Sequence, residues 1–219
     1  MEKETLKSIF NFIEEKEAHK MPFLWKWLNN EPLTEDDLII NDDLDLSNRK
    51  ITSLPEGFKV GGTLNLGNCT SLKSLPKDLK VGGHLALENC TSLISLPEGL
   101  EVQYDIHLSG CKNLKYLPIG LKIGGALDLE NCKSLTSLPE GLKVRGFLYL
   151  YNCKSLKYLP EGLKVGRFLD LRETNIKSLP KGLKVRSDLY IQQTPLEKFS
   201  DEELKEMVKP GFIKGKIYR

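Results

Sequence analysis

The stretch LDLENCKSLTSLPEGL, residues 127–142, is one unit of a pattern that fills most of the chain. Its Leu-Pro pair recurs at a constant step that shortens by one position only before the last pair. The pairs are Leu54-Pro55, Leu75-Pro76, Leu96-Pro97, Leu117-Pro118, Leu138-Pro139, Leu159-Pro160 and Leu179-Pro180. Such a short, fixed period is typical of a solenoid, in which each repeat buries its apolar face only against its neighbours. We therefore expect the 219 residues to form a stacked array.

Short apolar triplets in each repeat predict the strands of one parallel sheet. They are Leu44-Asp45-Leu46, Leu64-Asn65-Leu66, Leu85-Ala86-Leu87, Ile106-His107-Leu108, Leu127-Asp128-Leu129, Leu148-Tyr149-Leu150, Leu169-Asp170-Leu171 and Leu189-Tyr190-Ile191. Side chains alternate along a strand, so the outer two residues of a triplet should point inward and the middle one outward. We expect eight such strands. The Pro-Glu-Gly segment opposite them favours an extended back or a single 3₁₀ turn.

Five cysteines occupy one position of the repeat. They are Cys69, Cys90, Cys111, Cys132 and Cys153. An odd number of cysteines does not make a disulfide framework, and without a Cys-x-x-Cys pair there is no local zinc scaffold. Side chains stacked in register point the same way, so a bridge between neighbours would strain the ladder. We expect a column of buried, reduced thiols in a reducing compartment.

The two ends of the chain do not follow the repeat. We expect a helical N-terminal cap over residues 1–41, with an amphipathic helix at 3–17, an apolar segment at 23–28 and a short capped helix from Thr34. The tryptophans of the apolar segment are expected to cover the open end of the array, although they could instead anchor a partner. The array should span residues 42–197. A cap at 198–219 follows, with a helix opened by a capping box at Ser200 and a short strand or hairpin that shields the last strand.

The unit Leu127-x-Leu129-x-x-Cys132-x-x-Leu135-x-x-Leu138-Pro139-x-x-Leu142 resembles the leucine-rich repeat, with Cys where many families have Asn. It is most similar to the short repeats of bacterial and bacteriophage proteins, including secreted effectors, over residues 42–197. The resemblance implies an α/β repeat solenoid with its strands on a concave face that recognises a partner. The ubiquitin-ligase domain of some effectors has no room here, so the resemblance implies no enzyme activity.

Composition limits the classes of partner. The net charge is only +2, and the first twenty residues lack an apolar run of signal-peptide length. No run approaches the ~20 apolar residues of a membrane helix. We expect a soluble, cytoplasmic, monomeric protein without a cofactor, and export without a cleaved signal stays open. A row of lysines, broken by Glu101, is expected to be a solvated face, although it could instead contact phosphate or an acidic membrane surface: Lys59, Lys80, Lys122, Lys143, Lys164 and Lys184. We do not expect nucleic acid to bind, because the strand face is acidic.

An aromatic group on the outward strand positions predicts a protein-binding site. The repeat does not require rings there, since equivalent positions hold Gly, Ala, Thr and Ser. Aromatic anchors surrounded by polar residues are typical of binding hot spots. The alternative is that the rings only pack against one another across strands. We predict a non-enzymatic module that binds a protein through Phe147, Tyr149, Tyr151, Phe168, Asp128, Asp170 and Tyr190.

A second hypothesis is a metal or acid–base site. His84 and Asp105 should be lateral neighbours, as should His107 and Asp128. Histidine and carboxylate groups hold metals and transfer protons. However, an open strand face gives little shelter from water, and no nucleophile or third histidine stands nearby. Ordinary charge pairs across strands are the alternative.

The inward and outward assignment makes a direct prediction about stability. Leu129→Ala removes a side chain from the middle of the array and should lower the free energy of unfolding by ~2–5 kcal/mol. The surface change Lys143→Ala should stay within ~0.5 kcal/mol. Urea unfolding of both variants measures this, and equal effects would show that the assignment is wrong.

Overall fold

The computed structural model describes residues 22–219, so the expected helix at 3–17 lies outside the described residues. The chain divides into two compact units, residues 1–39 and 40–219. In the first unit, helix α2 (Pro22–Leu28) is followed by the 3₁₀ turn η1 (Asp36–Leu38). Lys26 Nζ lies 2.7 Å from a carboxylate oxygen of Asp37 and so ties the two elements together. Hydrogen bonds from Lys26 and from the Thr34 N–H lower the pKa of Asp37 to about 2. The expected role of the tryptophans as a lid stays a prediction.

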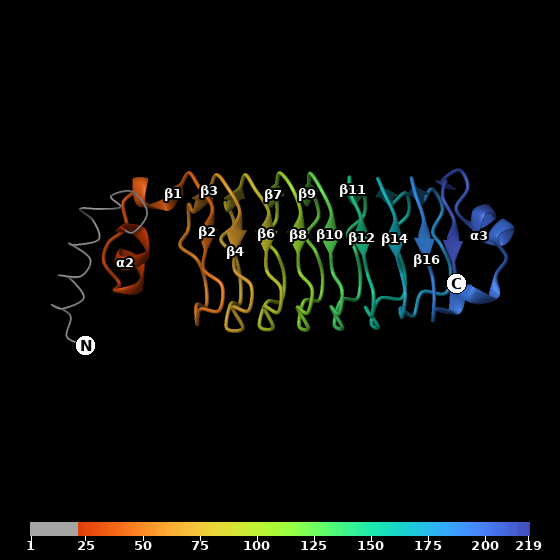
Figure 1. Ribbon diagram of the computed structural model, residues 1–219, viewed down its shortest axis with the longest axis horizontal. Coiled ribbons are helices and arrows are strands. Elements are labelled where there is room, and N and C mark those ends of the chain that lie inside the picture. Colours follow the sequence, from red (N-terminus) through yellow and green to blue (C-terminus); the bar gives the residue numbers. More distant parts are fainter. Residues whose placement is uncertain (1–21) are drawn as a thin grey trace. The chain divides into compact units, whose positions relative to one another are not determined.

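The second unit is a parallel β-solenoid whose turns contribute strands to two sheets of nine strands each (Figure 1). The apolar triplets form the sheet called here the triplet sheet. Its strands are β2 (Leu44–Asp45), β4 (Leu64–Asn65), β6 (Leu85–Ala86), β8 (Ile106–His107), β10 (Leu127–Asp128), β12 (Leu148–Tyr149), β14 (Leu169–Asp170), β16 (Leu189–Tyr190) and β18 (Ile217–Tyr218).

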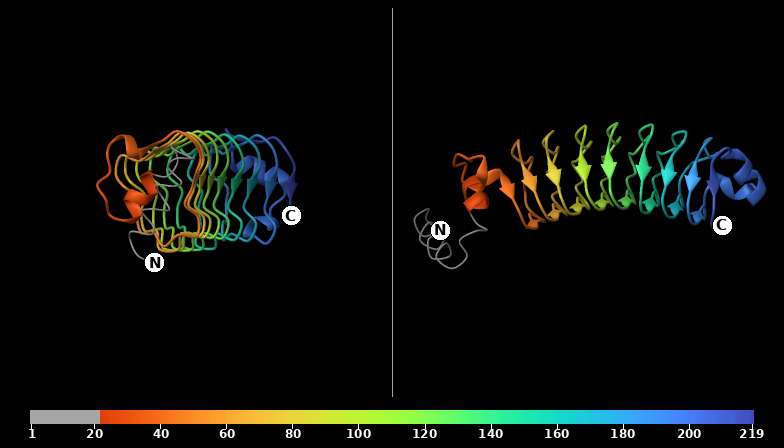
Figure 2. Two further views of the ribbon diagram at one scale, coloured as in Figure 1. Left: turned by 60° about the vertical axis from the view of Figure 1, so that its left-hand side comes forward. Right: turned by 90° about the horizontal axis from the view of Figure 1, so that it is seen from above.

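The other sheet, called here the lysine sheet, lies on the adjacent side of each turn. Its strands are β1 (Ile39–Ile40), β3 (Lys59–Val60), β5 (Lys80–Val81), β7 (Glu101–Val102), β9 (Lys122–Ile123), β11 (Lys143–Val144), β13 (Lys164–Val165), β15 (Lys184–Val185) and β17 (Phe212–Ile213). In most of these strands one residue faces the surface and one the core, as Lys143 and Val144 do. Figure 2 shows that the turns stack in a gently curved row.

The prediction of eight strands in a single sheet is therefore wrong. The Lys-Val strands are as short as the triplet strands and carry the same alternation, as in Leu142-Lys143-Val144, but sequence reasoning did not use that pattern. The C-terminal tail adds one strand to each sheet, because β17 pairs with β15 and β18 pairs with β16. The tail is thus two separate parallel strands and not a hairpin. β17 and β18 become the edge strands of the two sheets, and edge strands of only two residues limit edge-to-edge association.

Leucines at the triplet and Leu-Pro positions fill the space between the sheets and the back of each turn. Leu127, Leu129 and Leu138 are all buried, which confirms the predicted orientation of the triplet. The back of each turn contains no helix within residues 40–194, as the Leu-Pro segment predicted. The described residues beyond the array form η2 (Pro195–Lys198) and α3 (Asp201–Met207). The predicted capping box is present, because Ser200 and Glu203 exchange side-chain and backbone hydrogen bonds.

The five cysteines are free and buried, as predicted. Each thiol donates a hydrogen bond to a triplet carbonyl of the preceding turn, for example from Cys132 Sγ to Leu108 O at 3.2 Å and from Cys153 Sγ to Leu129 O at 3.0 Å. In the last two complete turns, threonine replaces the cysteine. The Thr174 hydroxyl donates to Leu171 O of its own turn at 2.7 Å. Cysteine and threonine thus both place a small hydrogen-bond donor at this position, and the thiols bond to the preceding turn whereas the Thr174 hydroxyl bonds within its own turn.

The corner that follows each triplet turns the chain with a positive φ. Asn occupies this position in most turns, with φ of 59° at Asn131 and at Asn152. Asn tolerates the left-handed region better than most other residues with a side chain. The amides also bond between turns, from Asn152 Nδ2 to Asn131 Oδ1 at 2.7 Å. The recurring Asn-Cys dipeptide is the sequence signal for this corner, which sequence reasoning did not use.

The buried thiols predict a specific pH dependence of stability. Burial raises the pKa of Cys90 and of Cys153 to about 12, and it raises the pKa of Cys132 as well. An unfolded thiol titrates near pH ~8.5, so above that pH the unfolded chain loses protons that the folded chain retains. Each thiol should therefore lower the free energy of unfolding by about 1.4 kcal/mol per pH unit as the pH rises from the unfolded toward the folded pKa.

Cys132→Ala tests this directly by urea unfolding under reducing conditions at about pH 8 and about pH 10. The variant should lose about 2 kcal/mol less than the wild type between these two values, because one titrating thiol is gone. For each protein the loss is measured from its own stability at pH 8, where the thiol is mostly protonated in both the folded and the unfolded state. This removes the effect of the variant's lower stability at that pH. An equal loss in both proteins would contradict the assignment of a raised thiol pKa.

Candidate functional site

The predicted site residues lie on the outward side of the triplet sheet, called here the triplet face. The strand register places the middle residue of each triplet beside that of the next turn. Asp128 lies between His107 and Tyr149, and Asp170 lies between Tyr149 and Tyr190. Equivalent residues of successive turns are therefore neighbours in one row. The residues predicted to bind a partner share this face from β10 to β16.

Five rings form a continuous line across four strands, called here the aromatic band: Phe147, Tyr149, Phe168, Tyr190 and Tyr218. The ring centroids of Phe147 and Phe168 lie 4.4 Å apart. Phe168 also packs edge-on against Tyr149 at 5.1 Å and against Tyr190 at 5.4 Å. Tyr190 stacks on Tyr218 at 4.8 Å. The predicted cross-strand packing of the rings is thus present, and the rings of Phe147, Tyr149 and Tyr190 still keep part of their surface exposed.

Tyr218 belongs to the band but was missed from the sequence. It is 37% exposed, and its Cα pairs in register with that of Tyr190 through β16 and β18. The tail lacks the Leu-x-Leu triplet, so its residues had no assigned direction. Gly215 and Lys216 before Ile217 follow the corner pattern of the other turns, and this is the signal that could have placed Tyr218.

Asp170 is a supporting residue rather than a contact surface. Its side chain is 2% exposed, and its two oxygens accept hydrogen bonds from Arg172 Nε at 2.9 Å and Nη2 at 2.5 Å. The hydrogen bond with Asp170 raises the pKa of Arg172. The guanidinium carbon of Arg172 lies 5.4 Å from the Tyr151 ring centroid and 5.8 Å from that of Tyr190. Asp170 therefore fixes a cation between two rings.

Tyr151 stands beside the aromatic band and lines a separate hollow. Its hydroxyl donates to Glu173 Oε1 at 2.7 Å. The hollow has a volume of about 410 Å³ and is lined by Glu130, Tyr151, Arg172, Glu173, Gln192 and Gln193. The buried side-chain oxygen of Gln192 accepts no hydrogen bond within the part of the chain that the structure describes. A buried acceptor without a partner is costly, so a donor that reached it would be favoured.

Carboxylates make the neighbouring part of the triplet face acidic. Asp128 and Glu130 follow each other along one turn, and Asp128 Oδ1 accepts the Glu130 N–H at 2.9 Å. Burial raises the pKa of Asp128. Burial also raises the pKa of Glu130, with the charge of Asp128 as the next cause. Two carboxylates held this close favour a cationic group from outside.

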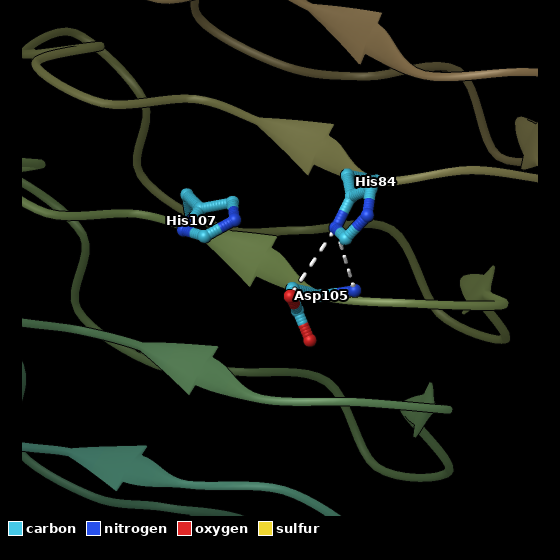
Figure 3. A group of neighbouring side chains, drawn as sticks. All are labelled: His84, Asp105 and His107. Carbon is cyan, nitrogen blue, oxygen red and sulfur yellow. Dashed lines mark hydrogen bonds and ion pairs between the residues drawn. The ribbon is translucent and has the colours of Figure 1, made fainter.

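The second predicted group is partly assembled. His84, Asp105 and His107 each offer a ligand atom, and these atoms all lie within 4.8 Å of one another (Figure 3). Asp128 is not a member of this group, although it was predicted with the other three. His84 Nδ1 lies 3.3 Å from a carboxylate oxygen of Asp105 and 3.3 Å from the Asp105 backbone nitrogen. The first contact needs a protonated Nδ1 and the second an unprotonated one, so this nitrogen has two competing partners.

Both side chains remain open to water, with 42% of His84 and 31% of Asp105 exposed. The Tyr104 ring stacks on His84 with centroids 5.2 Å apart, which limits how the imidazole turns. Asp105 Oδ1 also accepts the Ala126 N–H at 2.6 Å. One Asp105 oxygen is therefore engaged by the backbone, and the other faces His84.

Comparison of the chain with protein-family models, curated proteins and solved structures found no match. Within residues 22–219, no helix has both the length and the apolar character needed to cross a membrane. The site is therefore interpreted from its own geometry.

Proposed function

We propose that the chain is a non-enzymatic, leucine-rich-repeat-type module that binds a partner protein on its triplet face. The aromatic band is the observation that supports this proposal. Its rings occupy positions where most other turns hold small or polar residues, so the repeat does not need them. Partly exposed rings in a line, with charged groups beside them, have the composition of a binding hot spot.

The form of the face favours a protein over a small molecule. The aromatic band runs across the strands from β12 to β18 and is open along its length, whereas small ligands are usually enclosed by a concave pocket. The polar surroundings indicate what the partner presents. Asp128 and Glu130 favour a lysine or arginine on the partner.

Arg172 adds a cation with a fixed orientation to the proposed interface. Its guanidinium is held by the buried Asp170, so little side-chain entropy is lost when a partner packs over it. The proposal that the partner is a host protein, contacted by a bacterial or phage factor, is supported only by the resemblance of the repeat unit to such proteins.

Tyr149→Ala tests the placement of the interface. Tyr149 lies at the β12 end of the band, where its ring packs against Phe147 and Phe168, so its loss should weaken a captured partner by ~2 kcal/mol or more. Partners are captured from an extract of the native host and then titrated against the purified protein. Tyr158→Ala is the matched control, because Tyr158 is 71% exposed and lies on the back of the turn.

Circular dichroism and thermal unfolding should show that both variants remain folded. A partner that binds the Tyr149 variant as tightly as it binds the wild type would place the interface elsewhere.

A second function, binding of a divalent metal, is favoured by the grouping of His84, Asp105 and His107. Two imidazoles and a carboxylate are the ligand types that zinc binds at about 2.0–2.2 Å, and three ligands leave a position open for water. The ligand atoms would have to move closer than their present spread of up to 4.8 Å. Such a site would polarise a bound water molecule on an open surface.

Calorimetric titration of the protein with zinc chloride tests this second function. The wild type should bind one equivalent, and His107→Ala should weaken binding by at least about tenfold, since even the residues that support a metal ligand have effects of this size. Asp45→Asn, on the same face in β2 and three strands from His107, is the control and should bind as the wild type does. A wild type that binds no zinc would remove the hypothesis.

A further inference from the structure

The outward side of the lysine sheet carries a groove that the proposed protein interface does not use. It has a volume of about 440 Å³ and lies over strands β11, β13, β15 and β17. It is lined by Lys143, Val144, Arg145, Lys164, Val165, Gly166, Lys184, Arg186 and Phe212. Five of these residues are cations and none is an acid. Among residues 22–219, no ion pair involves any of the five.

The three lysines stand in register on neighbouring strands. Lys143 is paired with Lys164, and Lys164 with Lys184. Adjacent strands lie about 4.8 Å apart, and like charges directly opposite each other are destabilising. The same row is arranged differently nearer the N-terminus. There Glu101 stands between Lys80 and Lys122 and forms an ion pair with Lys122.

The two arginines are additions that the repeat does not require. The residue after each lysine-sheet valine or isoleucine is glycine in four turns, at Gly61, Gly82, Gly124 and Gly166. Arg145 and Arg186 replace that glycine on either side of Gly166. A Cβ at Gly166 would lie 1.9 Å from the backbone oxygen of Arg145, so close packing of the turns requires glycine there, while both arginines line the groove. A guanidinium group can donate two parallel hydrogen bonds to two phosphate oxygens, and a lysine ammonium group adds a compact positive charge.

We propose that this groove binds a compact anion that carries several phosphate groups. Five cations around one small hollow call for several negative charges close together, and the groove is of the size that holds small ligands. The ring of Phe212 closes one end, with Lys184 Nζ 6.0 Å and Lys214 Nζ 5.4 Å from its centroid. A soluble oligophosphate and a phosphorylated lipid headgroup share this chemistry.

Calorimetric titration with inorganic tripolyphosphate tests the proposal. The full chain should bind tripolyphosphate. The double variant Arg145→Gln, Arg186→Gln should bind it at least about tenfold more weakly, because two guanidinium groups that can hydrogen-bond to phosphate oxygens are lost. Glutamine is tolerated at this corner, because Gln103 occupies it in another turn. The matched control is Lys59→Gln, Lys80→Gln, which removes the same charge from the other end of the lysine sheet and should change binding less than about twofold.

Lys164→Glu separates binding from folding. The substitution places an acidic residue between Lys143 and Lys184, just as Glu101 stands between Lys80 and Lys122. The variant should unfold at a higher temperature than the wild type in low salt, lose that advantage in concentrated salt, and no longer bind tripolyphosphate. A variant that still binds tripolyphosphate as the wild type does would overturn the proposal.

Two further arms identify the source of the phosphates. Flotation with phosphatidylcholine vesicles that contain a phosphoinositide should recover the wild type but not the double arginine variant if the phosphates belong to a lipid. If neither tripolyphosphate nor these vesicles bind, the proposal is wrong. It is also wrong if a single-stranded oligonucleotide binds more tightly as its length grows while tripolyphosphate does not compete, because the groove would then recognise a polymer.

Discussion

Hydrogen bonding between successive turns is the interaction on which the rest of this structure depends. One turn is too thin to bury its own leucines, so each turn is stable only when its strands bond to the neighbouring turns. Leu127 N–H donates to Phe147 O at 2.9 Å and Leu129 N–H donates to Tyr149 O at 3.0 Å. The Cys132 thiol continues the same pattern by donating to Leu108 O of the turn before it. These bonds lock every turn in one register, so equivalent residues of successive turns form rows.

Fixed rows make departures from the repeat informative, and the departures concentrate in the C-terminal half. The aromatic band occupies the triplet face from Phe147 onward, and Arg145 and Arg186 enter the lysine sheet over the same turns. The two surfaces meet at the corner between the sheets. There the guanidinium carbon of Arg167 lies 5.1 Å from the Phe147 ring centroid, and Arg145 borders a hollow that also contains Phe147. The two proposed binding surfaces are therefore contiguous.

Particular residues show how far sequence reasoning reached. The burial of Leu127 and Leu129, the free buried cysteines and the grouping of Phe147, Tyr149, Phe168 and Tyr190 all followed from a regular period combined with strand alternation. The second sheet was missed, although Leu142-Lys143-Val144 alternates as the triplets do, because the segment beside Leu-Pro was interpreted only as a connection to the next strand. Tyr218 was missed because the tail breaks the period. Asp170 was expected to face a partner, but the triplet pattern gives only a direction and cannot show that Arg172 covers it.

The sequence by itself determined the stacking unit, the direction of its leucines and the one position that cysteine shares, because a repeat that buries itself against copies of itself must place the same residue type at the same point. Only the tertiary structure decided which outward side chains meet. The row of lysines followed from the period, but only the structure brought Arg145, Arg186 and Phe212 to the same groove. Side-chain placement also separated Asp128 from the group formed by His84, Asp105 and His107. These contacts depend on side-chain directions in turns that are distant in sequence, and those directions are set by packing rather than by the period.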